Sequence, residues 1–238
     1  MNDIHNQRRS FLKTSLGVAA VTVAPGLLLF DVAHGKSEAV SDKVRWGMLI
    51  DTANCADGCK DCVTACNKEN GLSGGLAPTD SQWIRKIEIK DVSAGRSFAL
   101  PMMCQHCEEP PCVDVCPTGA SFKRADGIVL VDKHLCIGCR YCMMACPYKA
   151  RSFVHEPLHD QNPDVPRGKG TVESCTLCVH RIDVGKQPAC AEACPNKSIL
   201  FGNLNDPDSE IAKKIRTVAS TQVRSDLGLN PGIRYQGL

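Results

Sequence analysis

The cysteines constrain this chain more than any other feature, because all sixteen of them fall into four groups of four. The groups are Cys55, Cys59, Cys62 and Cys66; Cys104, Cys107, Cys112 and Cys116; Cys136, Cys139, Cys142 and Cys146; and Cys175, Cys178, Cys190 and Cys194. In three of the groups a proline directly follows the last cysteine. No cysteine of the 238-residue chain is left over, so the fold has to use all four groups.

The third group has the spacing of a known metal-binding motif. Residues 136–147 spell CIGCRYCMMACP, the C-x2-C-x2-C-x3-C-P run whose thiolates bind [4Fe–4S] clusters in bacterial ferredoxins. Four groups of this kind predict four [4Fe–4S] clusters as the cofactors. A series of such clusters conducts single electrons, and no Ser/His/Asp arrangement, glycine-rich phosphate loop or acid pair stands out in the sequence. The sequence therefore predicts a protein that transfers electrons and is not itself an enzyme.

Three other uses of cysteine fit the sequence less well. Disulfides are common in exported proteins, but cysteines separated by two residues meet disulfide geometry poorly. Structural zinc sites combine two C-x2-C pairs, whereas the first and third groups each hold three cysteines plus one. Haem attachment needs C-x-x-C-H, and Glu108 and Val179 follow the C-x-x-C pairs where that motif requires histidine.

The N-terminal segment, residues 1–39, has the pattern of an export signal. Arg8 and Arg9 stand in the run QRRSFLK, which resembles the twin-arginine signal, and an apolar stretch follows over residues 16–30. This route passes folded proteins, so clusters inserted in the reducing cytoplasm could cross with the chain into the periplasm. The alternatives are an ordinary secretory signal or a retained membrane anchor, although about fifteen apolar residues are short for a span.

The body after residue 40 has little material for an ordinary core. Aromatic residues make up only 5% of the chain, so apolar burial alone would stabilise the body weakly. We expect the clusters to act as cores, so that metal binding contributes to folding. The net charge of +2 gives no indication of a nucleic-acid partner, and no stretch of the body has transmembrane length.

The chain contains an internal repeat. Residues 58–66 match residues 138–146 in the spacing of glycine and cysteines, and a strand-like run ending in aspartate precedes each. The first group differs from the third by one inserted residue, Asp57, so its first two cysteines have the spacing C-x3-C and not C-x2-C. The second and fourth groups are expanded, with a spacer between a C-x2-C pair and C-x3-C-P. In two-cluster ferredoxins, three cysteines of one motif and the last of the other share a cluster.

The segment between Cys116 and Cys136 looks like the turn, hairpin and strand that join the two halves of such a ferredoxin, so the two middle groups pair with each other and the two outer groups with each other. The predicted ligand sets are Cys55, Cys59, Cys62 and Cys194; Cys104, Cys107, Cys112 and Cys146; Cys116, Cys136, Cys139 and Cys142; and Cys66, Cys175, Cys178 and Cys190. Sequential pairing of the groups is the alternative. We expect an α+β fold, a duplicated bacterial-ferredoxin-like arrangement of two modules with two clusters each, loop insertions, and a C-terminal helix plus extended tail. The predicted parts are the signal segment 1–39, an outer module over 40–100 and 151–205, an inner module over 101–150, and the C-terminal helix and tail over 206–238.

Several local elements follow from the pattern. The segment between Cys116 and Cys136 predicts a turn and hairpin, and Trp83–Ile89 alternates like a strand. Short helices should begin within the cysteine groups, and residues 152–172 should form a surface loop. Asp208 is the expected N-cap of a helix. The apolar face of that helix would carry Ile211, Ile215 and Val218.

A few residues beside the ligands could influence a cluster. His106 and His180 could donate second-shell hydrogen bonds, although a purely structural role is the alternative. Lys60 and Arg140 bring positive charge next to ligands, which would raise a cluster's potential unless solvent screens it. The tail, residues 229–238, is expected to be extended and to pack on the body, or alternatively to clamp a partner.

The spacing from Cys55 to Cys194, together with the leader, resembles the four-cluster electron-transfer subunits of bacterial respiratory complexes, which include the partners of dimethyl sulfoxide, polysulfide, tetrathionate and nitrite reductases. Residues 102–153, the segment GNLNDPDSE and the ending IRYQGL resemble more closely the periplasmic ferredoxin-like subunit of the Dsr membrane complex, DsrMKJOP. That resemblance implies sulfur metabolism, with a polytopic quinone-interacting membrane subunit and a multihaem, triheme cytochrome c as partners.

Two functions therefore remain open. One is a relay inside a membrane complex between a quinone-interacting subunit and a cytochrome. The other is the electron-transfer subunit of a molybdopterin reductase of polysulfide, tetrathionate or dimethyl sulfoxide type, or of a hydrogenase. A free soluble ferredoxin is a third, less favoured possibility.

Overall fold

The structure is a computed structural model that describes residues 22–24, 27–28, 40–75, 77, 79–93, 95–159 and 161–238. The chain divides into two compact units, Met1–Glu38 and Ala39–Leu238. In the first unit the described residues form a small antiparallel pair, β1 (Thr22–Ala24) and β2 (Leu27–Leu28). Arg8 and Arg9 lie outside the described residues, so the twin-arginine signal stays a prediction. Within the described ranges, no helix combines the length and apolar character that a bilayer span requires.

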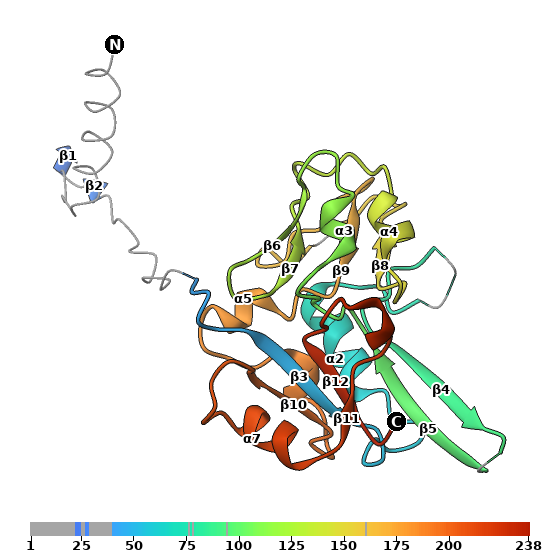
Figure 1. Ribbon diagram of the computed structural model, residues 1–238. Helices are drawn as coiled ribbons and strands as arrows, with labels where there is room; N and C mark the ends of the chain where they lie inside the picture. The colour runs from blue at the N-terminus through green and yellow to red at the C-terminus, as the bar shows by residue number, and fades with distance from the viewer. Residues whose placement is uncertain are drawn as a thin grey trace. The chain divides into compact units, whose positions relative to one another are not determined.

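A four-stranded sheet organises the second unit. Its order is β10 (Ile199–Asn203), β3 (Trp46–Asp51), β12 (Ile233–Gln236) and β11 (Ser220–Thr221). Strand β3 runs antiparallel to β10 and parallel to β12 (Figure 1). The sheet therefore joins the beginning of the unit to the end of the chain.

Three antiparallel hairpins complete the β structure. They are β4 (Arg85–Asp91) with β5 (Arg96–Met102), β6 (Ser121–Lys123) with β7 (Val129–Val131), and β8 (Arg151–Phe153) with β9 (Val172–Ser174). The hairpin predicted between Cys116 and Cys136 is confirmed. The alternating strand starts at Arg85, because Trp83 and Ile84 are buried in the core before the hairpin begins.

Three of the helices, α3 (Pro111–Asp114), α4 (Tyr141–Ala145) and α6 (Ala189–Glu192), are short turns that each carry one cysteine. The other helices are α2 (Asp61–Asn70), α5 (Val179–Ile182) and α7 (Glu210–Thr217), with a 3-10 turn, η1, at Ser225–Leu227. Proline opens α3, where a missing backbone N–H costs nothing, and Gly71 ends α2 in the left-handed conformation. Helix α2 contacts α6, and α3 contacts α4. The expectation that short helices begin within the cysteine groups is confirmed, whereas the division into two modules stays a prediction.

The C-terminal helix differs from expectation in its cap. Ser209, and not Asp208, is the N-cap of α7: its Oγ accepts a hydrogen bond from the amide of Ala212 at 3.2 Å. Asp208 lies one residue too early to reach that amide and is exposed. Ile211 is fully buried and Ile215 half-buried, so the predicted apolar face is present.

The segment predicted as a surface loop is shorter than expected. Its ends belong to β8 and β9, and only the residues between these strands form a loop. Val165 within that loop is buried. The loop is therefore fixed to the body by an apolar contact as well as by the two strands.

The end of the chain is part of the core. Ile233 and Tyr235 of β12 are both fully buried. The Tyr235 hydroxyl donates to the carbonyl of Pro101 at 3.0 Å and accepts from Nε2 of Gln105 at 3.2 Å. The expectation that the tail packs on the body is confirmed, and its role is to complete the sheet.

We predict that Tyr235→Ala destabilises the folded chain by about 3–5 kcal/mol, because it removes a buried aromatic side chain. Tyr235→Phe should cost about 1–3 kcal/mol, since it leaves the buried groups of Pro101 and Gln105 without their partner. Thermal unfolding followed by circular dichroism measures both. Leu238→Ala, in the exposed end of the same tail, is the control and should change stability by less than about 0.5 kcal/mol. An unchanged melting temperature for Tyr235→Ala would contradict the structural role of β12.

Candidate metal centres

The structure brings the cysteines together in four sets, here numbered sites 1 to 4. Site 1 is Cys55, Cys59, Cys62 and Cys194; site 2 is Cys104, Cys107, Cys112 and Cys146; site 3 is Cys116, Cys136 and Cys142, to which the sequence motif adds Cys139; site 4 is Cys66, Cys175, Cys178 and Cys190. Each set takes its members from two different cysteine groups. These neighbours agree with the predicted ligand sets, and ligation itself stays a prediction.

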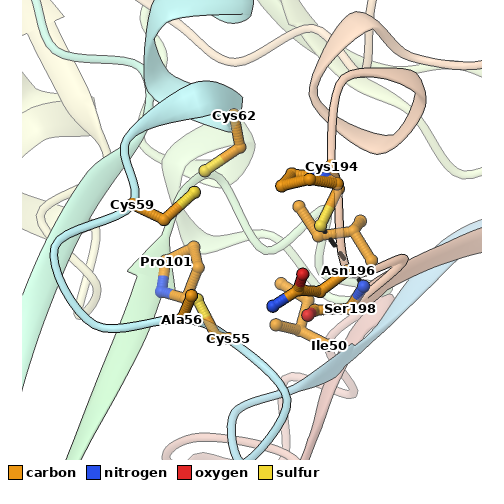
Figure 2. Close-up of a pocket in the computed structure, with 11 residues that line it drawn as sticks. Ile50, Cys55, Ala56, Cys59, Cys62, Pro101, Cys194, Asn196 and Ser198 are labelled. Atoms are coloured by element: carbon orange, nitrogen blue, oxygen red, sulfur yellow. Dashed lines mark hydrogen bonds between the residues drawn. The ribbon is translucent and has the colours of Figure 1, made fainter.

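Site 1 surrounds a small, largely apolar cavity. Cys59 and Cys62, from the turn before α2 and its first residues, lie on one side, and Cys194 lies opposite them (Figure 2). Ile50, at the end of β3, lines the same cavity with Pro101. The thiols thus face an apolar hollow between the two cysteine groups.

Site 4 lies deepest in the protein. All four of its cysteines are buried. Burial raises the pKa of Cys66, and the nearby sulfur of Cys178 raises it further, while a hydrogen bond from Asn70 opposes the rise. Burial likewise raises the pKa of Cys175 and of Cys190, with Cys66 the next cause for both. Cys66 therefore stands with the cysteines of the fourth group and not with those of its own.

Site 2 is also entirely buried. Burial raises the pKa of both Cys104 and Cys107 to about 12, and the neighbouring sulfurs of Cys112 and Cys146 add to the effect. A thiolate in this site is costly unless positive charge accompanies it. Iron supplies such charge, and the donor set of four thiols fits a [4Fe–4S] cluster.

Site 3 is the most open of the four. Cys139 is exposed, and Cys116 and Cys136 are partly exposed. Burial acts to raise the pKa of Cys116, but hydrogen bonds from the Ser121 amide and the Thr118 hydroxyl outweigh it and lower the pKa.

Backbone amides donate hydrogen bonds to four cysteines, two in site 3 and one each in sites 1 and 4. The amide of Ser121 donates to Cys116 at 3.3 Å, that of Val172 to Cys136 at 3.4 Å, and that of Ser198 to Cys194 at 3.2 Å. In site 4 the amide of Leu177 donates to Cys175 at 3.4 Å. Such N–H groups stabilise the negative charge of a thiolate. These hydrogen bonds depend on the path of the backbone, so the residue types at these positions could not predict them.

The sites follow one another in the order 1, 4, 2, 3. Burial is the main cause of each raised cysteine pKa, and a sulfur of the neighbouring site adds to it at each of the three junctions between sites. Cys62 of site 1 acts on Cys190 of site 4, Cys104 of site 2 acts on Cys175 of site 4, and Cys142 of site 3 acts on Cys112 of site 2. The two middle sites are buried, and the two end sites reach the surface.

The two histidines beside ligands have different surroundings. His106 is buried, and its Nδ1 accepts a hydrogen bond from the Val129 amide at 3.0 Å. Burial lowers the pKa of His106 to about 3, so its ring is neutral. His180 forms a 2.9 Å contact with the Glu69 carboxylate. Both therefore have structural partners within the protein, and their influence on a cluster stays a prediction.

The two cations expected beside clusters are both exposed. Lys60 lies at the start of α2, and Arg140 lies over the Phe153 ring, 3.8 Å from its centroid. Solvent screens charges at such positions. A third cation, Arg151, was not predicted from the sequence. It is buried, so solvent screens its charge less, and its Nη2 donates to the Cys112 sulfur at 3.1 Å.

Single metal ions need ligands that converge on one point. Within the part of the chain that the structure describes, no group of three or more His, Cys, Asp or Glu side chains is arranged to hold a single metal ion.

Several known proteins are similar to this chain over most of its length. The 4Fe–4S dicluster domain family matches residues 96–204. The Hdr-like menaquinol oxidoreductase iron-sulfur subunit 1 of Archaeoglobus fulgidus is 39% identical, with 98% of each chain covered. A subunit of the tetrathionate reductase of Salmonella typhimurium is 37% identical over 99% of this chain and 90% of its own. Protein NrfC of Escherichia coli is 40% identical over 94% of this chain and 92% of its own.

The shared sites give a direct test of ligation. We predict that Cys66→Ser damages the cluster at site 4 while the cluster at site 1 is better preserved, and that Cys194→Ser does the reverse. Electron paramagnetic resonance of the reduced protein, together with iron analysis, distinguishes the two variants. If Cys66→Ser instead abolished the signal of site 1, sequential pairing of the groups would replace the sets described above.

Proposed function

The chain belongs to a family of iron–sulfur electron-transfer subunits that carry a 4Fe–4S dicluster domain, and from this premise we propose that sites 1 to 4 hold four [4Fe–4S] clusters that relay single electrons between two partner proteins. The members of this family transfer electrons and do not catalyse the reaction themselves. The observation that carries the proposal is the order of the sites, in which two buried sites connect two sites at the surface.

The protein's own residues provide the conditions for such a relay. When bound, the clusters supply the one-electron chemistry. The cysteines hold them in two pairs of sites that share cysteine groups, sites 1 and 4 and sites 2 and 3. Buried walls around the middle sites keep water away, and backbone amides offset part of the negative charge of the sulfurs.

A relay requires one partner at each end. We propose that one end faces a quinone-interacting membrane subunit, which the name of the menaquinol oxidoreductase relative supports. A multihaem cytochrome c at the other end, in a Dsr-type complex of sulfur metabolism, rests only on the sequence resemblance.

A second candidate has more support from the relatives. In this version the chain is the electron-transfer subunit of a reductase, as the name of the tetrathionate reductase relative indicates for that protein. Isolation of the native complex distinguishes the two candidates, because the first contains a multihaem cytochrome and the second a molybdopterin subunit.

The relay can be interrupted in the middle. We predict that Cys175→Ala, which removes a proposed ligand from site 4, blocks electron passage along the chain. In the isolated complex, a quinol should then reduce clusters on only one side of site 4, and overall turnover should fall to a small fraction of the wild-type rate. Freeze-quenched paramagnetic resonance during reduction measures which clusters receive electrons.

The control for this experiment is Val92→Ala in the exposed turn between β4 and β5. It should retain about sixteen iron atoms and about sixteen sulfides per chain, as four cubane clusters require, and wild-type turnover. Wild-type rates in Cys175→Ala, with its iron content reduced, would refute a relay through site 4.

We further propose export through the twin-arginine route to the periplasm, where partner subunits hold the chain at the membrane. Replacing both Arg8 and Arg9 with lysine should leave folded, cluster-bearing protein in the cytoplasm. Cell fractionation with iron analysis measures this outcome. Normal periplasmic amounts of the double variant would contradict the proposal.

A further inference from the structure

Arg151 is a buried cation between two of the cysteine sites. It is the first residue of β8 and is only 5% exposed. Its Nη2 donates to the sulfur of Cys112 in site 2 at 3.1 Å and to Oγ of Ser121 at 2.8 Å. Its side chain also interacts with the thiol of Cys142 in site 3, through a side-chain hydrogen bond and through its charge. One side chain therefore acts on ligands of two adjacent sites.

Carboxylates do not neutralise this charge. Among the described residues, no Asp or Glu forms an ion pair with Arg151, and its Nε and Nη1 have no hydrogen-bond partner. Arg167, whose side chain is only 7% exposed, differs in this respect, because Glu173 binds it with both oxygens at 2.7 and 2.9 Å. The sulfurs of sites 2 and 3, once they ligate clusters, would therefore supply the counter-charge of Arg151.

An unpaired buried guanidinium is strongly unfavourable, so its position requires a partner of opposite charge. Arginine is not deprotonated in proteins, so the side chain of Arg151 remains charged. Buried pairs of this kind are screened far less by salt than exposed ones.

We propose that Arg151 raises the reduction potentials of the clusters at sites 2 and 3 relative to those at sites 4 and 1, so that this half of the relay is where an electron resides. The inference rests on the proposed function. Reduction adds one negative charge to a cluster, and a nearby buried cation stabilises that charge. The sulfurs that act on the guanidinium belong to sites 2 and 3, so the effect should be confined to that half of the chain of sites.

Arg140 provides a matched comparison. It stands next to Cys139 in sequence, but it is exposed and rests on the Phe153 ring. Solvent screens the charge of Arg140. Arg140 is therefore a cation next to site 3 that, unlike Arg151, is not buried. His106 contributes no charge, because its Nδ1 accepts a hydrogen bond from the Val129 amide and therefore carries no proton.

The test is a redox titration of Arg151→Gln, Arg151→Met and Arg151→Lys in the full chain, followed by paramagnetic resonance with iron and sulfide analysis. In either neutral variant, the ratio of reduced to oxidised cluster at sites 2 and 3 should fall about tenfold at a fixed ambient potential, which corresponds to about 59 mV for one electron. Sites 1 and 4 should titrate as in the wild type. Arg151→Lys should keep the potentials of sites 2 and 3 close to the wild-type values, because the charge is retained. Arg140→Gln should change these potentials little.

The outcomes separate this inference from the proposed function. A neutral variant with full iron content and unchanged potentials would overturn the role of Arg151 while leaving the relay intact. A uniform shift of all four clusters would also overturn it. If both neutral variants lost iron from sites 2 and 3 while Arg151→Lys kept it, the charge would serve assembly and not the potential, which overturns the inference as well. A wild-type chain without four clusters would instead refute the proposed function.

Discussion

The structure depends on one requirement: sixteen sulfur atoms have to be placed in a small protein with the negative charge of their thiolates compensated. Burial raises the pKa of most of these thiols, so a thiolate in their position needs a compensating group. The protein supplies amide hydrogens, one buried guanidinium and, in the proposed function, iron. Because the apolar core includes many of the same cysteines, the sites and the core stabilise each other. Metal binding and folding are therefore coupled.

The sheet arises from the same constraint. Strand β3 leads into the first cysteine group and β10 leaves the fourth, so their antiparallel pairing brings Cys194 beside Cys55, Cys59 and Cys62. Strand β12 then covers the other edge of β3, and its fully buried Tyr235 bonds to Pro101 and Gln105, beside the start of the second cysteine group. The end of the chain thus connects the outer cysteine groups to the inner ones, which explains why a tail without cysteines lies in the core.

Spacing predicted the four sets because ligands close together in sequence are held by local turns, and the repeat indicated which groups exchange their last cysteine. The local elements were also predictable: the hairpin before Cys136 and the helix containing Ile211 are present. The predicted N-cap of α7 was wrong because Asp208 and Ser209 are both favourable N-cap residues. Which of them caps the helix depends on the residue at which the helix begins, and only the Ser209 oxygen reaches the amide of Ala212. Arg151 was not predictable, since its contact with Cys112 spans 39 residues and depends on where hairpin β8–β9 packs.

The middle sites and the end sites differ in their exposure to solvent. Sites 4 and 2 have no exposed cysteine, so the neighbouring sites are the most accessible acceptors for an electron on either of them. Sites 1 and 3 each have partly or fully exposed sulfurs, so partners can approach there. The potentials of the two partners set the direction of flow, and the potentials along the series set where an electron resides. The buried charge of Arg151, which no carboxylate matches among the described residues, lies beside sites 2 and 3. An asymmetric charge distribution in an otherwise repeated arrangement therefore gives the clusters of the two halves different affinities for an electron.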